Sequence, residues 1–319
     1  MSLRFRTPLP SVHGDVPRPP LSLADWFRLG GLVLVLHLLC PGLEHAVWAQ
    51  AADVPTYELD RPDATVSLPN TLREASGLIV LTDDLVGTIE DERGLLYLVE
   101  TATGRIGSAK RFGPDGDYEG LTHVGPRVFV LRSDGTLFDI ADWRADSLVV
   151  RIHASPLSRR HDTEGVAYDP DTHQLLVACK EYAGPGRARQ KAIFAFDLAT
   201  ETWRPDPVAT VSLSAFNRLA EDSQLDRMLR RFLTPFLDVS GFKPSGLALH
   251  PTTGHRYVLS SGRSSLVILA PDGTLLDVQA LPQDLLPQPE GIAFTPDGDL
   301  LIATEGVLAQ SHLLRFGAR

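Results

Sequence analysis

Five copies of one short motif constrain the fold of this chain more than any other feature. In each copy a glycine follows a small or acidic residue and precedes an aliphatic residue that begins a short apolar run. The glycines are Gly77, Gly120, Gly165, Gly246 and Gly291. Successive glycines are separated by 43, 45, 81 and 45 residues. A period in the forties, with several short strands in each unit, is typical of a β-propeller.

The segments that follow the glycines repeat one order of strands and turns. In the third copy an apolar strand at 165–169 meets a turn at 170–173, and a second strand follows at 174–178. The last two copies have the same plan, again with proline in the turn. Proline fixes φ, and a following Asp or Gly accommodates the turn. The repeats therefore predict an all-β fold in which each copy forms one blade.

The step of 81 residues leaves two alternatives for the number of blades. Within it, Ser212–Phe232 carries apolar residues at spacings of three and four, with Ser214 as an expected N-cap and Pro235 as a stop. This pattern favours an inserted helix over another set of strands. We therefore predict a five-bladed β-propeller with one inserted helix, and six blades is the alternative.

With 319 residues the chain is long enough for one propeller domain, which we place at residues 52–319. Polar and apolar residues alternate from Tyr57 to Leu68. This segment is expected to supply the outer strand of the last blade and so to close the ring.

Residues 1–51 have the composition of a targeting segment. Four arginines precede the apolar run Leu29–Leu39, and Ala49-Gln50-Ala51 provides a small-x-small cleavage site. A run of about a dozen apolar residues is shorter than the roughly 20 that span a bilayer. We therefore predict a signal peptide, with an uncleaved N-terminal membrane anchor as the alternative. Either places the propeller outside the cytoplasm, in the periplasm or secreted.

The charge balance argues against nucleic acid as a partner. The chain has 30 basic and 40 acidic residues and a formal net charge of −10. Nucleic acids and anionic lipids call for a basic patch, which this composition does not indicate. Contact with a membrane is expected only through the N-terminal segment.

Glutamates occupy the same motif position in three of the five copies. If the repeats close into a ring, Glu119, Glu164 and Glu290 converge on its axis. Hard divalent cations suit such oxygen donors, and Ca²⁺ accepts six to eight of them in loose geometry. The sequence therefore predicts a calcium site at these glutamates. Three further carboxylates, at the ends of second strands, are candidate ligands: Asp91, Glu181 and Glu305.

Two alternatives to a calcium-binding module are open: one needs no metal, and the other uses the metal for catalysis. Arg132 and Lys180 hold strand-end positions and would neutralise Glu119 and Glu164 by ion pairing, which would only lock the blades together. A calcium-dependent hydrolase, of lactonase, esterase or phytase type, is the other. A lactonase needs a base near the ion, and the candidates are His123, His161 and His250. A phytase needs a basic set that holds phosphate, and the candidates are Arg132, Lys180, Lys243 and Arg263.

Six short runs, taken together, resemble one known family. They are residues 74–78, 115–121, 131–137, 178–181, 243–246 and 288–293. In this order they are similar to the SdiA-regulated, YjiK-like propeller family, and the resemblance extends from about Leu68 to the C-terminus. It implies a five-bladed propeller related to NHL repeats, exported or anchored at its N-terminus, with bound calcium and no established activity. The long, proline-rich leader departs from the family pattern.

We therefore expect an exported, monomeric, calcium-binding propeller that acts as a binding module rather than as an enzyme. Its partner is an unknown protein or small-molecule ligand. The alternatives are the calcium-dependent hydrolase and a metal-free interaction scaffold.

Overall fold

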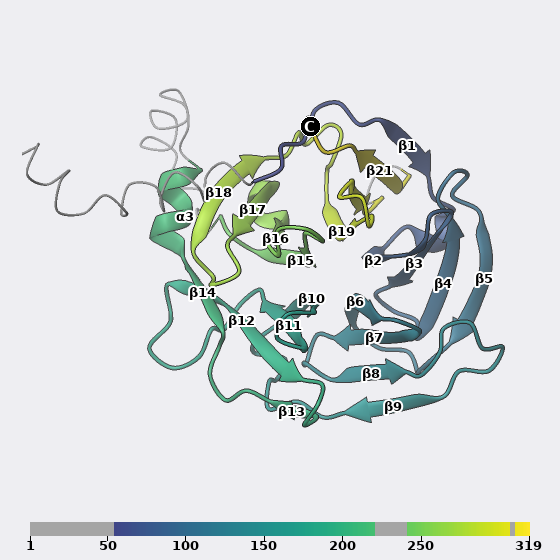
Figure 1. Cartoon of the computed structure of the whole chain (residues 1–319), viewed down its shortest axis with the longest axis horizontal. Helices are drawn as coiled ribbons and strands as arrows, with labels where there is room; N and C mark the ends of the chain where they lie inside the picture. The colour runs from purple at the N-terminus through teal and green to yellow at the C-terminus, as the bar shows by residue number, and fades with distance from the viewer. Residues whose placement is uncertain (1–53, 221–240, 307–309) are drawn as a thin grey trace, which may run out of the picture. The chain divides into compact units, whose positions relative to one another are not determined.

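The computed structural model describes residues 54–220, 241–306 and 310–319. In this part of the chain the strands form five antiparallel sheets, and Figure 1 shows them as blades around a central axis. The five-bladed β-propeller predicted from the repeats is therefore confirmed. The predicted leader, residues 1–51, lies outside the described residues. No helix among the described residues has the length and apolar character that a membrane crossing requires.

Each blade begins with its inner strand and proceeds outward along the chain. Blade 1 consists of β2 (Ala75–Thr82), β3 (Leu85–Glu90), β4 (Leu95–Glu100) and β5 (Ile106–Arg111). Blade 2 consists of β6 (Tyr118–Val124), β7 (Arg127–Arg132), β8 (Leu137–Ile140) and β9 (Val150–His153). Blade 3 consists of β10 (Thr163–Asp169), β11 (Gln174–Cys179), β12 (Gln190–Asp197), β13 (Thr202–Trp203) and β14 (Ala209–Ser212).

The last two blades follow the same order, except that the outermost strand of blade 5 is β1, from the N-terminal end of the described residues. Blade 4 consists of β15 (Pro244–Leu249), β16 (Arg256–Ser260), β17 (Ser265–Leu269) and β18 (Leu275–Ala280). Blade 5 consists of β19 (Pro289–Phe294), β20 (Leu300–Thr304), β21 (His312–Phe316) and β1 (Ala64–Ser67). Short 3₁₀ helices lie at η1 (Asn70–Leu72) and η2 (Ser261–Arg263).

The ring closes through the N-terminal strand. β1 pairs antiparallel with β21, with Val66 opposite Leu313, so blade 5 is built from both ends of the domain. Figure 1 shows the purple β1 beside the yellow β21. The expected closure by the segment from Tyr57 to Leu68 is therefore confirmed, with the strand itself confined to four residues.

The long step between the third and fourth motifs contains the inserted helix. α3 spans Leu213–Leu219 and lies against β14 and β18, where Phe216 stacks on Phe242 with ring centroids 5.0 Å apart. The expected N-cap at Ser214 is wrong, because Ser212 holds the extended N-cap conformation and Ser214 is already helical. The rest of the predicted helix, with Pro235, lies outside the described residues.

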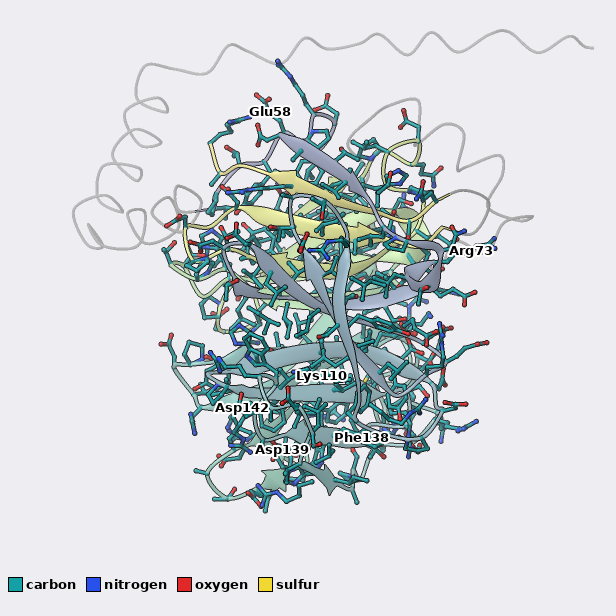
Figure 2. All side chains as sticks on the ribbon, turned by 90° about the vertical axis from the view of Figure 1, so that its right-hand side faces the viewer. Glu58, Arg73, Lys110, Phe138, Asp139 and Asp142 are labelled. Atoms are coloured by element: carbon teal, nitrogen blue, oxygen red, sulfur yellow. The ribbon has the colours of Figure 1, made fainter. Side chains whose placement is uncertain are left out.

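Five apolar clusters fill the spaces between neighbouring blades. The cluster between blades 2 and 3, for example, joins Phe129 and Leu131 to Val177 and Phe194. Polar contacts add to these cores on the outer side. Lys110 of β5, shown near Asp142 in Figure 2, donates hydrogen bonds to the carbonyl oxygens of Trp143 and Ala145, each at 2.9 Å.

The motif glycines lie where the inner strands approach each other most closely. A methyl group added at Gly165 would meet the backbone nitrogen of Leu247, in the next blade, at 2.6 Å. At Gly120 it would meet the carbonyl oxygen of Glu164 at 2.9 Å. Side chains do not tolerate such distances to backbone atoms, so glycine is required here for close approach. The five glycines thus form a ring, here called the glycine ring.

We expect Gly165→Ala to destabilise the protein by about 1–3 kcal/mol or more, because the added methyl group overpacks against a backbone that cannot move aside. Thermal or urea unfolding measures the change. Gly107→Ala is the matched control, since its nearest atom, the Leu98 carbonyl oxygen, lies at 3.7 Å. Equal stability of the two variants would contradict the close-packed ring.

Candidate functional site

A backbone irregularity recurs at the same place in every blade. The pairing of the inner strand with the second strand shifts register across the residue that precedes the motif glycine. A bulge of this kind re-aims a side chain that would otherwise follow the pleat. The five residues at this position are Ser76, Glu119, Glu164, Ser245 and Glu290.

Four of these residues line one narrow part of the axial channel. Glu119, Glu164 and Glu290 share this space with Ser76. Ser245 is fully buried and donates a hydrogen bond to the Pro289 carbonyl oxygen at 2.8 Å. The structure thus brings together the three glutamates that the sequence places on the axis. We call this end of the channel, where the inner strands begin, the acidic face.

A lysine already neutralises one of the three glutamates. The Lys180 ammonium lies 2.6 Å from the Glu164 carboxylate, whose side chain is 4% exposed. The nearby carboxylates of Asp162 and Glu290 also favour the charged form of Lys180. The expected Lys180–Glu164 ion pair is therefore confirmed.

The corresponding pair in the preceding blade does not form. Arg132 binds Asp134 through two nitrogens, at 3.0 and 2.7 Å, and also donates to Thr136. The expected Arg132–Glu119 ion pair is therefore wrong. The Arg132 side chain points into the β7–β8 turn because Asp134, two residues later, offers both carboxylate oxygens to its guanidinium group.

Burial and mutual repulsion keep protons on the axial glutamates. Burial raises the pKa of Glu119, and the neighbouring Glu164 carboxylate raises it further. Burial also raises the pKa of Glu290 well above its ordinary value, with Glu164 and Glu305 adding to the effect. Desolvation favours the neutral form of a carboxyl group, and a nearby like charge acts in the same direction. Without a cation, burial and the neighbouring carboxylates therefore favour the protonated forms of Glu119 and Glu290.

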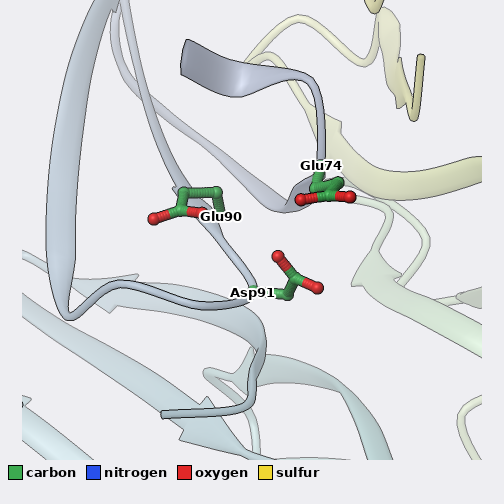
Figure 3. A group of neighbouring side chains, drawn as sticks. All are labelled: Glu74, Glu90 and Asp91. Carbon is green, nitrogen blue, oxygen red and sulfur yellow. The ribbon is translucent and has the colours of Figure 1, made fainter. Parts of the chain in front are cut away.

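A second group of acids lies at the edge of the acidic face. Glu74, Glu90 and Asp91 offer oxygen atoms that all lie within 4.8 Å of one another, and Figure 3 shows them at the start of β2 and the end of β3. Among the described residues this is the one cluster of at least three His, Cys, Asp or Glu residues with that spacing. The carboxylate oxygens of Glu119, Glu164 and Glu290 are therefore not all within 4.8 Å of one another.

Asp91 is the least satisfied member of this second group. Its Oδ1 is buried and has no hydrogen-bond partner among the described residues. Burial, followed by the charges of Glu74 and Glu90, raises the pKa of Asp91 to about 6. Glu90, by contrast, forms an ion pair with Arg93 at 2.6 Å. Asp91 thus presents an oxygen that a cation would satisfy.

The two remaining candidate ligands lie differently. Glu305 belongs to the acidic face. Burial raises its pKa, and the nearby charges of Asp91, Glu74 and Glu164 raise it further. It also accepts a hydrogen bond from Gln288 at 3.1 Å. Glu181 does not line the channel with the axial glutamates, and its carboxylate lies 3.7 Å from the Lys191 ammonium.

Sequence reasoning missed Glu74 and Glu90 as members of the acidic face. A signal was present for Glu74, which holds the same motif position as Asp117 and Asp162. Glu90 gave no such signal. It lies opposite Ala75 in the β2–β3 pair and is the last residue of an otherwise apolar strand.

The histidines expected to serve as a base do not gather at the acidic face. His123 and His250 line a wide cavity at the opposite end of the channel. His161 accepts a hydrogen bond at Nδ1 from the Ser158 amide at 3.0 Å and packs its ring against Tyr182. Among the described residues, none of the three histidines forms a hydrogen bond or ion pair with a glutamate of the axis.

The basic residues considered for phosphate binding are dispersed in the same way. Arg132 and Lys180 are bound to acids, as described above. Arg263 lies over the ring of Phe216 and donates a hydrogen bond to Asn217 at 3.2 Å, which attaches the inserted helix to blade 4. The geometry therefore does not favour a phytase-like site.

Comparison with known proteins supports the fold. No protein-family model and no curated protein matches the sequence. Among solved structures, glutaminyl cyclase from Myxococcus xanthus superposes with a TM-score of 0.53 at 13% identity, covering 81% of this chain and 95% of that one. The PQQ-bound aldose sugar dehydrogenase from Streptomyces coelicolor gives a TM-score of 0.50 at 12% identity, covering 83% of this chain and 99% of that one. At this identity the likeness shows a propeller fold alone, and no family model confirms membership of the SdiA-regulated or NHL families.

In the presence of a chelator, we expect stability to fall from pH 5 to pH 8, with a slope of about 1.4 kcal/mol per pH unit for each proton that the folded state retains. The folded protein keeps protons on Glu119 and Glu290 that the unfolded chain loses above its ordinary glutamate pKa of 4.5. The folded state therefore binds more protons, and rising pH favours unfolding. Urea unfolding across this range measures the slope.

The double variant Glu119→Gln/Glu290→Gln should flatten this dependence, because its amides do not titrate. Asp83→Asn, at an exposed position, is the control and should leave the slope unchanged. An equally steep slope in the double variant would show that other groups cause the pH dependence.

Proposed function

We propose that this chain is an exported, monomeric β-propeller that binds Ca²⁺ at its acidic face and acts as a binding module for a protein or small-molecule ligand. The observation that carries the calcium proposal is the buried Asp91 Oδ1, which has no hydrogen-bond partner among the described residues and lies within 4.8 Å of oxygens of Glu74 and Glu90. The composition of residues 1–51 supports export.

The acids at the edge of the acidic face fit a calcium ion better than the axial three do alone. Asp91 and Glu74 supply hard oxygen donors and form no ion pair among the described residues, and Glu305 of blade 5 interacts electrostatically with both. Ca²⁺ tolerates irregular arrangements of carboxylate and carbonyl oxygens. When bound, it supplies the positive charge that allows these acids to ionise together. Glu119, Glu164 and Glu290 extend this ligand field toward the axis.

A role in binding is favoured over hydrolysis by the positions of the histidines. His123 lies four residue steps after Glu119 along β6, which at about 3.3 Å per residue places their backbones roughly 13 Å apart. General-base catalysis requires hydrogen-bond reach to the reacting group or to one bridging water. His123 therefore does not serve as a base for an ion held by the glutamates. Because propellers host many chemistries, the fold itself does not decide the activity.

We expect Ca²⁺ to raise the thermal midpoint of the purified protein, while Mg²⁺ and chelator do not. A ligand that binds only the folded state stabilises it by about 2.7 kcal/mol at a hundred-fold excess over Kd. Differential scanning fluorimetry compares the wild type with two variants, Asp91→Asn and Glu119→Gln/Glu164→Gln. Both variants should reduce the calcium response, and Asp91→Asn should reduce it more.

Asp83→Asn serves again as the control and should keep the full calcium response. If calcium and chelator gave the same midpoint for the wild type, the metal proposal would fail. The acids would then be ion-paired or protonated contacts of a metal-free scaffold. A response that survived both variants would place the ion elsewhere.

Replacing Lys180 should strengthen calcium binding, because its ammonium competes for the same carboxylates. Lys180→Met leaves Glu164 without its ion-pair partner, and loss of such a partner from a buried pair costs about 3–5 kcal/mol. Calcium should recover part of this loss. Isothermal titration calorimetry measures the affinity, with Lys243→Met as the control at a lysine just before β15. Equal affinities in wild type and Lys180→Met would show that Lys180 and calcium do not compete.

A further inference from the structure

A wide cavity lies at the end of the channel opposite the acidic face. Its volume is about 630 Å³, and its walls are formed by the ends of the five inner strands, by the turns that follow β6, β10 and β15, and by Arg256 and Pro271. This volume falls in the range of pockets that hold small molecules, about 300–1,000 Å³. The cavity uses none of the acids considered above for calcium.

A ring of aliphatic side chains forms the floor of this cavity. Each inner strand contributes the residue directly after its motif glycine, and all five are at most 4% exposed. The same residues line the narrow acidic space on the other side. They therefore mark the boundary between the two spaces. These residues, here called the aliphatic ring, are Leu78, Leu121, Val166, Leu247 and Ile292.

An arginine in the cavity wall lacks partners for much of its guanidinium group. Arg256 is 6% exposed, and its Nε and Nη1 have no hydrogen-bond partner among the described residues. Asp169 and Asp272 lie close enough to favour its charge, but Asp169 Oδ1 already accepts the amides of Asp171 and Thr172, at 3.0 and 3.4 Å. A buried donor without an acceptor costs about 1–3 kcal/mol, and more when it is charged. Burial still lowers the pKa of Arg256, so the two aspartates offset only part of the cost of its charge, and the guanidinium group is deficient in acceptors.

A histidine in the same wall has the same deficiency. His250 is 4% exposed, and its Nδ1 accepts the Thr253 amide at 3.4 Å. In a neutral imidazole the other nitrogen is then the donor. That nitrogen, Nε2, has no partner among the described residues. The His250 ring packs against Phe294 with centroids 5.0 Å apart, so an aromatic surface lies beside this donor.

We propose that this cavity binds a small organic carboxylate with an apolar body. The unpartnered polar atoms on its wall are donors, of Arg256 and His250, so they call for an oxygen-rich, anionic group. The aliphatic ring and Phe294 call for an apolar remainder. Charge-assisted hydrogen bonds to a carboxylate are the strong kind, and arginine is well suited to form them. The proposal does not depend on calcium binding at the acidic face.

Isothermal titration calorimetry with 4-phenylbutyrate tests the proposal, alongside 4-phenylbutan-1-ol and 4-phenylbutylamine, which share the apolar body. Each titration is made on the purified chain with chelator and again with calcium. The carboxylate should bind at least tenfold more tightly than the alcohol or the amine. Arg256→Met should weaken the carboxylate at least tenfold and leave the alcohol unchanged. His250→Gln should have a smaller effect in the same direction.

Arg151→Met, on the exposed outer strand β9, is the matched control and should bind the carboxylate like the wild type. The comparison of the three compounds on the wild type keeps the test decisive if Arg256→Met does not fold. Equal binding of acid and alcohol would show a merely apolar cavity and would overturn the proposal. So would absence of binding by the acid, or wild-type affinity in a folded Arg256→Met.

Discussion

The contact between neighbouring inner strands at the glycine ring is the constraint on which the rest of this propeller depends. At Gly246 an added methyl group would meet the Glu290 carbonyl oxygen at 2.6 Å, and at Gly291 it would meet the Gly77 carbonyl carbon at 3.2 Å. The ring therefore passes from each blade to the next and back to the first. Because the backbones touch at the axis, the spaces between the blades have fixed width, and five separate apolar clusters fill them.

The same constraint explains why the chain places charge on its axis. The bulge beside each glycine turns one side chain out of the pleat, and closure of the ring makes these side chains converge. Five carboxylates in so narrow a space would repel strongly in a medium of low dielectric constant. Two positions are serines, Ser76 and Ser245, and the Lys180 ammonium lies against Glu164. The site is thus an asymmetric set of acids whose charge is limited by protons and by one lysine.

The period of the glycines predicted the fold because each blade needs a glycine where its backbone touches the next blade. The spacing of these glycines can be read directly from the sequence. Convergence of Glu119, Glu164 and Glu290 followed from the equivalence of the blades. The partners of side chains did not follow, since Arg132 and Glu181 have similar places in the repeat plan but turn to Asp134 and Lys191. The cavity was hidden for another reason. Its walls are ordinary strand residues, and only the structure shows which polar atoms among them lack partners.

The aliphatic ring determines how strongly the two ends of the channel affect each other. An anion bound at Arg256, which pairs with Leu249 four residues along β15 from Ser245, would lie roughly 13 Å from the level of the axial glutamates. At an effective dielectric constant of about 20, one unit charge at this distance repels it by about 1.3 kcal/mol. Ionised together, the acids would oppose an anion by several times this amount. Protons on Glu119 and Glu290, the Lys180 ammonium, or a bound cation each remove part of that repulsion. Control of charge at the acidic face is therefore a condition for an anion site at the other end.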